Sequence, residues 1–175
     1  SGGTIVAATG AYKAGAVGSV TDVVTVTDSL GNKASANVTV TKAIAVTPVA
    51  TNVAPRGAAS FAASGGAGGY TFSLATNASG ANVTASSGAY TAGAKGGVVD
   101  VVRVTDQNGA VTSATITVGP QITISPTPAH APPLGKLTLV AQGGAGFGYV
   151  WELAATASGG SLDTVTGEYV AGPTA

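Results

Sequence analysis

Four aspartates recur at fixed positions and could bind a metal ion. Asp22 and Asp28 are matched by Asp100 and Asp106, 78 positions later in the chain. Calcium takes six to eight oxygen ligands, so carboxylates at a domain end are candidates for a site that stiffens a joint. Each pair, however, lies at opposite ends of one expected strand, too far apart to share an ion. The favoured interpretation is that Asp28 and Asp106 open turns by hydrogen bonding to the backbone, with calcium as the alternative.

Tyrosine recurs within the pattern G-x-Y-x-A-G, at Tyr12, Tyr90 and Tyr169. Aromatic faces can stack on sugars, which would make these residues a binding platform. A buried ring whose hydroxyl ties down a loop, as in the tyrosine corner of β-sandwiches, is the other interpretation. We favour the structural role because a residue repeated in every unit usually serves the fold.

A second aromatic group lies near the C-terminal end. Phe72 and Trp151 occupy equivalent positions on a predicted third strand and are typical of the core aromatic of a sandwich. By strand alternation, Phe147, Tyr149 and Trp151 share one face. These three residues are therefore a candidate site for a glycan or a protein ligand.

Few residues of the chain could take part in catalysis. His130, the one histidine, lies in a proline-rich segment where a positioned base is unexpected. Glu152, Asp163 and Glu168 could supply paired carboxylates for glycoside hydrolysis, but they belong to an incomplete domain. The glycine-rich run at 65–69 is followed by neither a helix nor a lysine, as phosphate binding would require. We therefore assign no catalytic residue and predict that the chain is not an enzyme.

Composition excludes further classes. Among 175 residues only 8 % are charged, and seven acids balance seven bases without a basic run, which argues against nucleic acid as a partner. Cysteine is absent, so there is no disulfide framework and no thiolate metal site. No apolar run approaches the roughly 18 residues of a membrane span. We expect no cofactor, with calcium as the exception considered above.

An internal repeat organises the chain. Residues 1–40 align without gaps on 79–118 (79 − 1 = 78), with 22 of 40 residues identical, and a third copy begins at Ser158. The intervening half repeats too, with Phe147 as a one-residue insertion. This period suits a compact β-sandwich rather than a solenoid unit. We predict boundaries near 43 and 120. They give the C-terminal half of one repeat at 1–43, a complete repeat at 44–119 and the N-terminal half of another at 120–175.

The elements that position these residues are strands. Val102 and Val104 alternate with polar neighbours, as do Val24 and Val26 in the first copy, which predicts that these valines point inward. Asn108 and Gly109 predict a hairpin turn because both tolerate positive φ. Short strands are also expected at 44–46, 58–63, 70–74, 89–91 and 113–118. We predict an all-β fold of tandem antiparallel sandwiches with Greek-key connections.

The pattern D-x-V-x-V-T-D-x-x-G-x-x-x-S-A, preceded by G-x-Y-x-A-G, resembles bacterial immunoglobulin-like or cadherin-like tandem modules. It spans Gly88 to Ala114 and its counterpart 78 positions earlier. The resemblance implies immunoglobulin-like sandwiches outside the cell or on its surface. It identifies no single function, because such modules serve as spacers, adhesins and carbohydrate-binding accessories.

Two function classes follow. The first is a structural or adhesive module, in which tandem repeats form a stalk, a fibre or a surface filament and neighbouring copies of the same or a related protein are the partners. The alternative is an accessory module that binds a surface glycan or protein through its aromatic face. The half-domains further suggest that residues 120–175 could be completed by residues 1–43 of another copy through strand addition. Against this, residues 1–15 duplicate 158–172, so one copy of that segment would be redundant. A piece of a longer chain explains the same facts.

Overall fold

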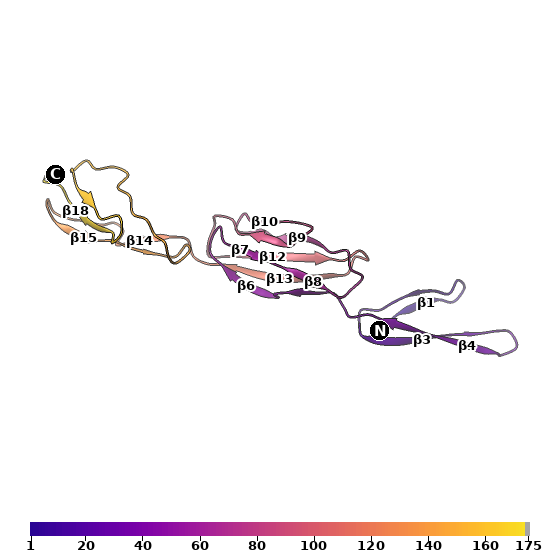
Figure 1. Ribbon diagram of the computed structural model, residues 1–175. Helices are drawn as coiled ribbons and strands as arrows, with labels where there is room; N and C mark the ends of the chain where they lie inside the picture. Colours follow the sequence, from indigo (N-terminus) through magenta and orange to yellow (C-terminus); the bar gives the residue numbers. More distant parts are fainter. Residues whose placement is uncertain (174–175) are drawn as a thin grey trace.

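The computed structural model describes residues 1–173 and shows an elongated all-β molecule (Figure 1). We name three parts by the predicted boundaries: the N-terminal unit (1–43), the middle unit (44–119) and the C-terminal unit (120–173). They follow one another along the molecule, with the two outer units at opposite ends. Residues 1–173 contain no helix, and hence none that could span a membrane.

The middle unit is an immunoglobulin-like β-sandwich. Its largest sheet has four strands in the order β6-β13-β12-β9, in which β6 runs parallel to β13 and the other neighbours are antiparallel. The strands β10, β11 and β7 form a second sheet, and β5 pairs with β8. The bounds are β5 (Ala45–Thr47), β6 (Ala50–Val53), β7 (Ala58–Ser60), β8 (Ala62–Ser64), β9 (Thr71–Thr76), β10 (Asn82–Val83), β11 (Ala89–Thr91), β12 (Val98–Thr105) and β13 (Val111–Val118).

Alternation along β12 and β13 builds the core of this unit. Val102, Val104 and Ile116 are fully buried, whereas the intervening Arg103 is exposed, as the period-two pattern predicts. Phe72, on β9 of the same sheet, and Phe61, between β7 and β8, pack into the same cluster. The outcome confirms the predicted inward face of this hairpin.

The outer units each contain part of this arrangement. The N-terminal unit has two separate antiparallel hairpins, β1-β2 and β3-β4. The C-terminal unit has the pair β14-β16 and the sheet β15-β18-β17. The bounds are β1 (Thr4–Val6), β2 (Ala11–Lys13), β3 (Val20–Thr27), β4 (Lys33–Val40), β14 (Thr123–Ser125), β15 (Lys136–Thr138), β16 (Val140–Gln142), β17 (Ser161–Leu162) and β18 (Glu168–Val170).

Two details differ from the sequence prediction. Val26 is 66 % exposed and Val24 is half-buried, although both were predicted to point into a core. Within residues 1–43 only the β1-β2 hairpin lies opposite β3, across a cavity, and it leaves these two valines incompletely covered. The turn after β12 is also longer than a two-residue hairpin. Its loop runs from Asp106, whose N–H bonds to the Ala110 carbonyl at 2.9 Å, and of the pair Asn108-Gly109 only Gly109 has positive φ.

Short backbone contacts hold the joints between units. At the first joint, the N–H of Ser19 donates to the carbonyl of Thr41 at 3.1 Å, and the N–H of Gly66 donates to that of Lys42 at 2.7 Å. At the second joint, the N–H of Gly97 donates to the carbonyl of Gly119 at 2.8 Å, and the N–H of Gly144 donates to the carbonyl of Pro120 at 3.0 Å. Each connecting segment is therefore hydrogen-bonded to the unit before it and to the unit after it.

Candidate functional site

The most densely bonded polar group of the middle unit surrounds Asp100 on β12. Both of its carboxylate oxygens accept hydrogen bonds. Oδ1 accepts from the backbone N–H groups of Ala78 and Ser79 at 2.6 and 3.0 Å. Oδ2 accepts from the Ser79 hydroxyl and, at 2.6 Å, from the Tyr90 hydroxyl. Ser79 Oγ in turn accepts from the N–H of Gly93 at 2.9 Å, so one carboxylate ties together β11, β12 and two loops.

Burial makes this group structural rather than catalytic. Asp100 is fully buried and Tyr90 is 1 % exposed, with its ring edge-on to Phe61 at a centroid distance of 6.2 Å. A serine beside an aspartate could suggest a nucleophile, but both residues are buried and the one histidine of the chain, His130, lies in the C-terminal unit. The prediction that the recurring tyrosine is a buried ring whose hydroxyl fixes a loop is confirmed at Tyr90.

The electrostatics of the group follow from its bonds. Burial acts to raise the pKa of Asp100, but the hydrogen bonds from Ser79, Tyr90 and the backbone outweigh it, and the pKa is lowered. Burial and then the bond to Asp100 raise the pKa of Tyr90 to about 12. The carboxylate thus stays ionised and the phenol stays protonated, as the observed donor–acceptor pattern requires.

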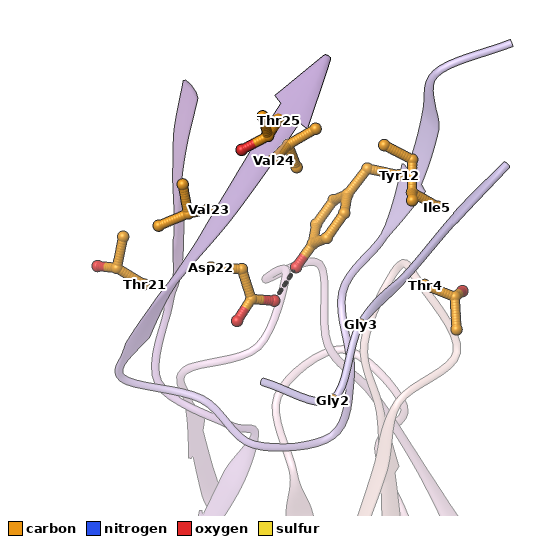
Figure 2. A pocket seen from close by; sticks show the side chains of 10 residues that line it. All are labelled: Gly2, Gly3, Thr4, Ile5, Tyr12, Thr21, Asp22, Val23, Val24 and Thr25. Carbon is orange, nitrogen blue, oxygen red and sulfur yellow. Dashed lines mark hydrogen bonds between the residues drawn. The ribbon is translucent and has the colours of Figure 1, made fainter. Parts of the chain in front are cut away.

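The same Ser–Tyr–Asp group recurs in the N-terminal unit. Asp22 on β3 accepts hydrogen bonds from the hydroxyls of Tyr12 and Ser1. A cavity of about 450 Å³ lies beside it, between β3 and the β1-β2 hairpin, and Figure 2 shows the Tyr12 ring reaching across to Asp22. Ile5 and Val24 also line this cavity.

In the C-terminal unit, two members of the group are present. The hydroxyls of Ser158 and Tyr169 lie 3.1 Å apart, and the N–H of Gly172 donates to Ser158 Oγ at 3.3 Å. Residues 120–173 contain no counterpart of Asp100. Sequence reasoning did not single out the serine of this group. Its signal was the S-G pair that opens each copy, always eleven residues before the tyrosine.

The other two recurring aspartates open turns. Asp106 accepts hydrogen bonds from the backbone N–H groups of Ala67, Asn108 and Ala110 at 2.8 to 2.9 Å. Asp28 accepts from the backbone of Leu30 and from both the backbone and the side chain of Asn32. These bonds lower the pKa of both carboxyl groups. The predicted turn chemistry is confirmed.

This arrangement does not fit the ligand set that calcium takes. Asp22 and Asp28 lie at opposite ends of β3, as do Asp100 and Asp106 on β12, and all four already accept hydrogen bonds. Within residues 1–173 no group of three or more His, Cys, Asp or Glu side chains could hold a metal ion. Calcium binding at these residues stays the alternative interpretation.

The three aromatic residues predicted to share a face lie in different environments. Phe147 is 78 % exposed on a loop. The Tyr149 hydroxyl donates to the Gly143 carbonyl at 2.7 Å, exactly as its counterpart Tyr70 bonds to Gly65. Trp151 lies against Gly167, as Phe72 lies against Gly88. Among residues 1–173 the ring–ring contact is that of Phe61 with Tyr90, so the three rings do not stack on one another.

Comparison with known proteins gives distant structural similarity. No family model matches the chain, and no curated protein matches it. An intimin mutant from EHEC O157:H7 is similar with a TM-score of 0.37 and 23 % identity, over 47 % of this chain and 49 % of that one. A 282-residue C-terminal fragment of intimin, solved in complex with the intimin-binding domain of its translocated receptor, has a TM-score of 0.35 and 23 % identity, over 58 % and 40 %.

The extracellular domain of protocadherin GammaB4 is also similar, with a TM-score of 0.32 and 17 % identity, over 89 % of this chain and 34 % of that one. The chain thus spans half or less of the length of these structures. At such scores the assignment of an immunoglobulin-like sandwich rests on the strand order and core of the middle unit.

Proposed function

We propose that the chain is a structural or adhesive module, in which tandem immunoglobulin-like repeats form a stalk, fibre or surface filament outside a bacterial cell. The observation that carries the proposal is the reuse of one internal bonding scheme from unit to unit. Tyr12, Tyr90 and Tyr169 all bond within their own repeat, and two of them hold an aspartate of the next strand. The most repeated polar residues therefore build the units rather than meet a substrate.

The joints support the same function. Each connecting segment is short and hydrogen-bonded on both sides, which limits bending between neighbouring units. The charge is low and balanced, so outer faces of small polar side chains can pack against other copies at little desolvation cost. An extended, repeated and stiffly joined molecule suits a spacer or a fibre. The extracellular location is supported by the sequence pattern, which resembles that of secreted and cell-surface modules.

Surface labelling tests this proposal. An antibody raised against residues 44–119 should label intact cells of the producing organism, and external protease should remove the label without releasing a cytoplasmic marker. Labelling that requires prior cell lysis would overturn the location and with it the stalk.

A binding function is the second candidate, favoured by the exposure of Phe147. An exposed aromatic ring on a glycine-rich loop could stack on a sugar or dock into a protein partner. A glycan array probed with the chain and with the Phe147→Ala variant tests this function. Binding of one glycan class that the variant loses would support it, and identical profiles would contradict it.

Calcium dependence is tested separately. If Asp22, Asp28, Asp100 or Asp106 holds calcium, EDTA should lower the melting temperature and added calcium should restore it. An unchanged melting temperature would remove calcium from the proposal.

A further inference from the structure

The first joint depends on a glycine-rich loop of the middle unit. The loop 65–69 lies between β8 and β9 and meets the segment that leads in from the N-terminal unit. The N–H of Gly66 donates to the carbonyl of Lys42 at 2.7 Å. A Cβ added to Gly65 would lie 2.2 Å from the carbonyl oxygen of Ala43, so the loop and the segment are in direct backbone contact. The position of this loop therefore determines how the connecting segment enters the middle unit.

The loop has no side chain that could fix its own shape. It consists of four glycines and Ala67, and all four glycines have positive φ. Glycine adopts this conformation without a steric penalty, but it also loses more conformational freedom than any other residue when it is held there. The shape of the loop therefore depends on hydrogen bonds from residues outside it.

The turn that follows β12 supplies these bonds to the middle of the loop. Oδ2 of Asp106 accepts a hydrogen bond from the N–H of Ala67 at 2.8 Å. The next residue, Gln107, donates twice, from its N–H to the carbonyl of Gly68 at 2.9 Å and from its Nε2 to the carbonyl of Ala67 at 2.7 Å. The start of the loop is held separately by Tyr70, whose hydroxyl donates to the first carbonyl of the loop at 2.7 Å.

Asp106 divides its two carboxylate oxygens between the turn and the loop. Oδ1 accepts from the N–H groups of Asn108 and Ala110 within the turn, at 2.9 Å each, whereas Oδ2 accepts from the loop. The side chain is buried, and a Cβ added to Gly66 would lie 2.4 Å from Oδ2. The hydrogen bonds, that of Ala67 first, lower the pKa of Asp106, so the carboxylate is ionised at neutral pH. A charged acceptor is thus packed against the residue that bonds to the connecting segment.

We propose that Asp106 is a positioning residue of the first joint, which sets the orientation of the N-terminal unit on the middle unit through the 65–69 loop. The path is continuous, because Asp106 binds the N–H of Ala67 and the adjacent Gly66 binds the carbonyl of Lys42. Displacing Ala67 displaces Gly66 and with it the connecting segment. This role goes beyond opening the turn, for which the bonds to Oδ1 suffice.

This role of Asp106 rests on the proposed function, because a fixed orientation between units is what a stalk or a fibre requires. The two fail separately. Surface labelling that requires cell lysis would overturn the extracellular stalk and leave the geometry of the joint unaffected. A joint that does not respond to the loss of the Asp106 carboxylate would overturn the positioning role and leave the labelling unaffected.

The distance between two spin labels measures the joint directly, because the chain has no cysteine of its own. Asn37→Cys on β4 and Thr115→Cys on β13 are exposed, equivalent positions of the two units. Pulsed electron paramagnetic resonance on this doubly labelled parent chain gives the distribution of the distance between them. Asp106→Ser keeps a side-chain oxygen that can open the turn but is one bond too short to reach Ala67. The distance distribution should become broader or shift to another mean.

A second variant and a matched control separate the loop from the turn. Gln107→Ala removes the Nε2 bond to the loop and leaves Asp106 in place, so it should change the distribution in the same direction but less. Gly109→Ala is the control, because a φ of +82° strains the turn for any other residue while the added Cβ would meet nothing within 4 Å. It should lower the denaturation midpoint and keep the distance distribution of the parent chain.

Two results overturn the proposal. One is the parent distribution in both Asp106→Ser and Gln107→Ala, at denaturation midpoints that show the middle unit to be folded. The other is a change in Gly109→Ala as large as that in Asp106→Ser, which would show that any strain in the turn moves the joint. If Asp106→Ser does not fold, Gln107→Ala decides: an unchanged distribution overturns the proposal, and a changed one supports it.

Discussion

The carboxylate of Asp100 accepts four hydrogen bonds, more than any other carboxylate of the middle unit. The ionised form, which only accepts, matches these four donors. Asp100→Asn keeps the shape but replaces one acceptor oxygen with a donor that faces other donors. We expect this variant to lower the free energy of unfolding by roughly 3 kcal/mol, as for a buried charge-assisted network. Chemical denaturation measures it. Asp28→Asn, the same change at an exposed turn, should cost about 1 kcal/mol or less; equal losses would contradict the prediction.

Tyr90 should make the stability of the folded chain depend on pH, and the direction of its pKa shift gives the sign. Its pKa is raised to about 12 in the folded chain, against about 10 for a free tyrosine. The folded state therefore holds a proton that the unfolded state loses, so stability is fully present below pH 10 and declines as the pH rises from about 10 toward 12. Denaturation midpoints measured across this range should fall. In Tyr90→Phe the fall should be smaller, and an equal fall in both proteins would assign it to other tyrosines.

At the scale of elements, equivalent strands of two units should contribute differently to the free energy of unfolding. Val102 on β12 is fully buried, whereas its counterpart Val24 on β3 is half-buried beside a cavity. Val102→Ala should lower the free energy of unfolding by about 2 kcal/mol, through lost burial and the cavity left behind. Val24→Ala, measured on dilute chains, should change it by less than about 0.5 kcal/mol. Equal losses would show that β3 is covered in solution as β12 is.

This contrast shows what sequence patterns can and cannot predict. Alternation predicted the inward face of β12, and the structure confirms it because the layer that covers this face lies within the same repeat. It predicted the same face for Val26, which the β1-β2 hairpin opposite β3 leaves exposed, because periodicity indicates the side on which a residue lies and not whether that side is covered. The structural role of the recurring tyrosine was predictable because the residue repeats in every unit. Its serine and aspartate partners were not, because they are separated in sequence and meet only across strands.

At the scale of the whole molecule, the joints transmit the orientation of one unit to the next. The segment 119–122 passes so close to Gly96 that a Cβ there would lie 2.4 Å from the Gly119 carbonyl oxygen and 2.6 Å from the Gln121 nitrogen. Gly18 is the equivalent residue at the first joint, where the Thr41 carbonyl oxygen would lie 2.3 Å away. Both joints thus depend on a residue without a side chain where the connecting segment leaves the preceding unit.

Gly96→Ala should therefore displace the second joint while leaving each unit folded, because the clash involves only backbone of the connecting segment. Small-angle scattering should show a changed maximum dimension or a broader distribution, and limited proteolysis should cut faster near 119–122. Gly119→Ala is the matched control in the same segment, since its Cβ would meet its closest neighbour, the Val53 carbonyl oxygen, at an ordinary 3.6 Å. If both variants scatter like the wild type, contacts elsewhere set the geometry of the joint. If both change alike, the segment is sensitive to any added side chain and the role assigned to Gly96 is wrong.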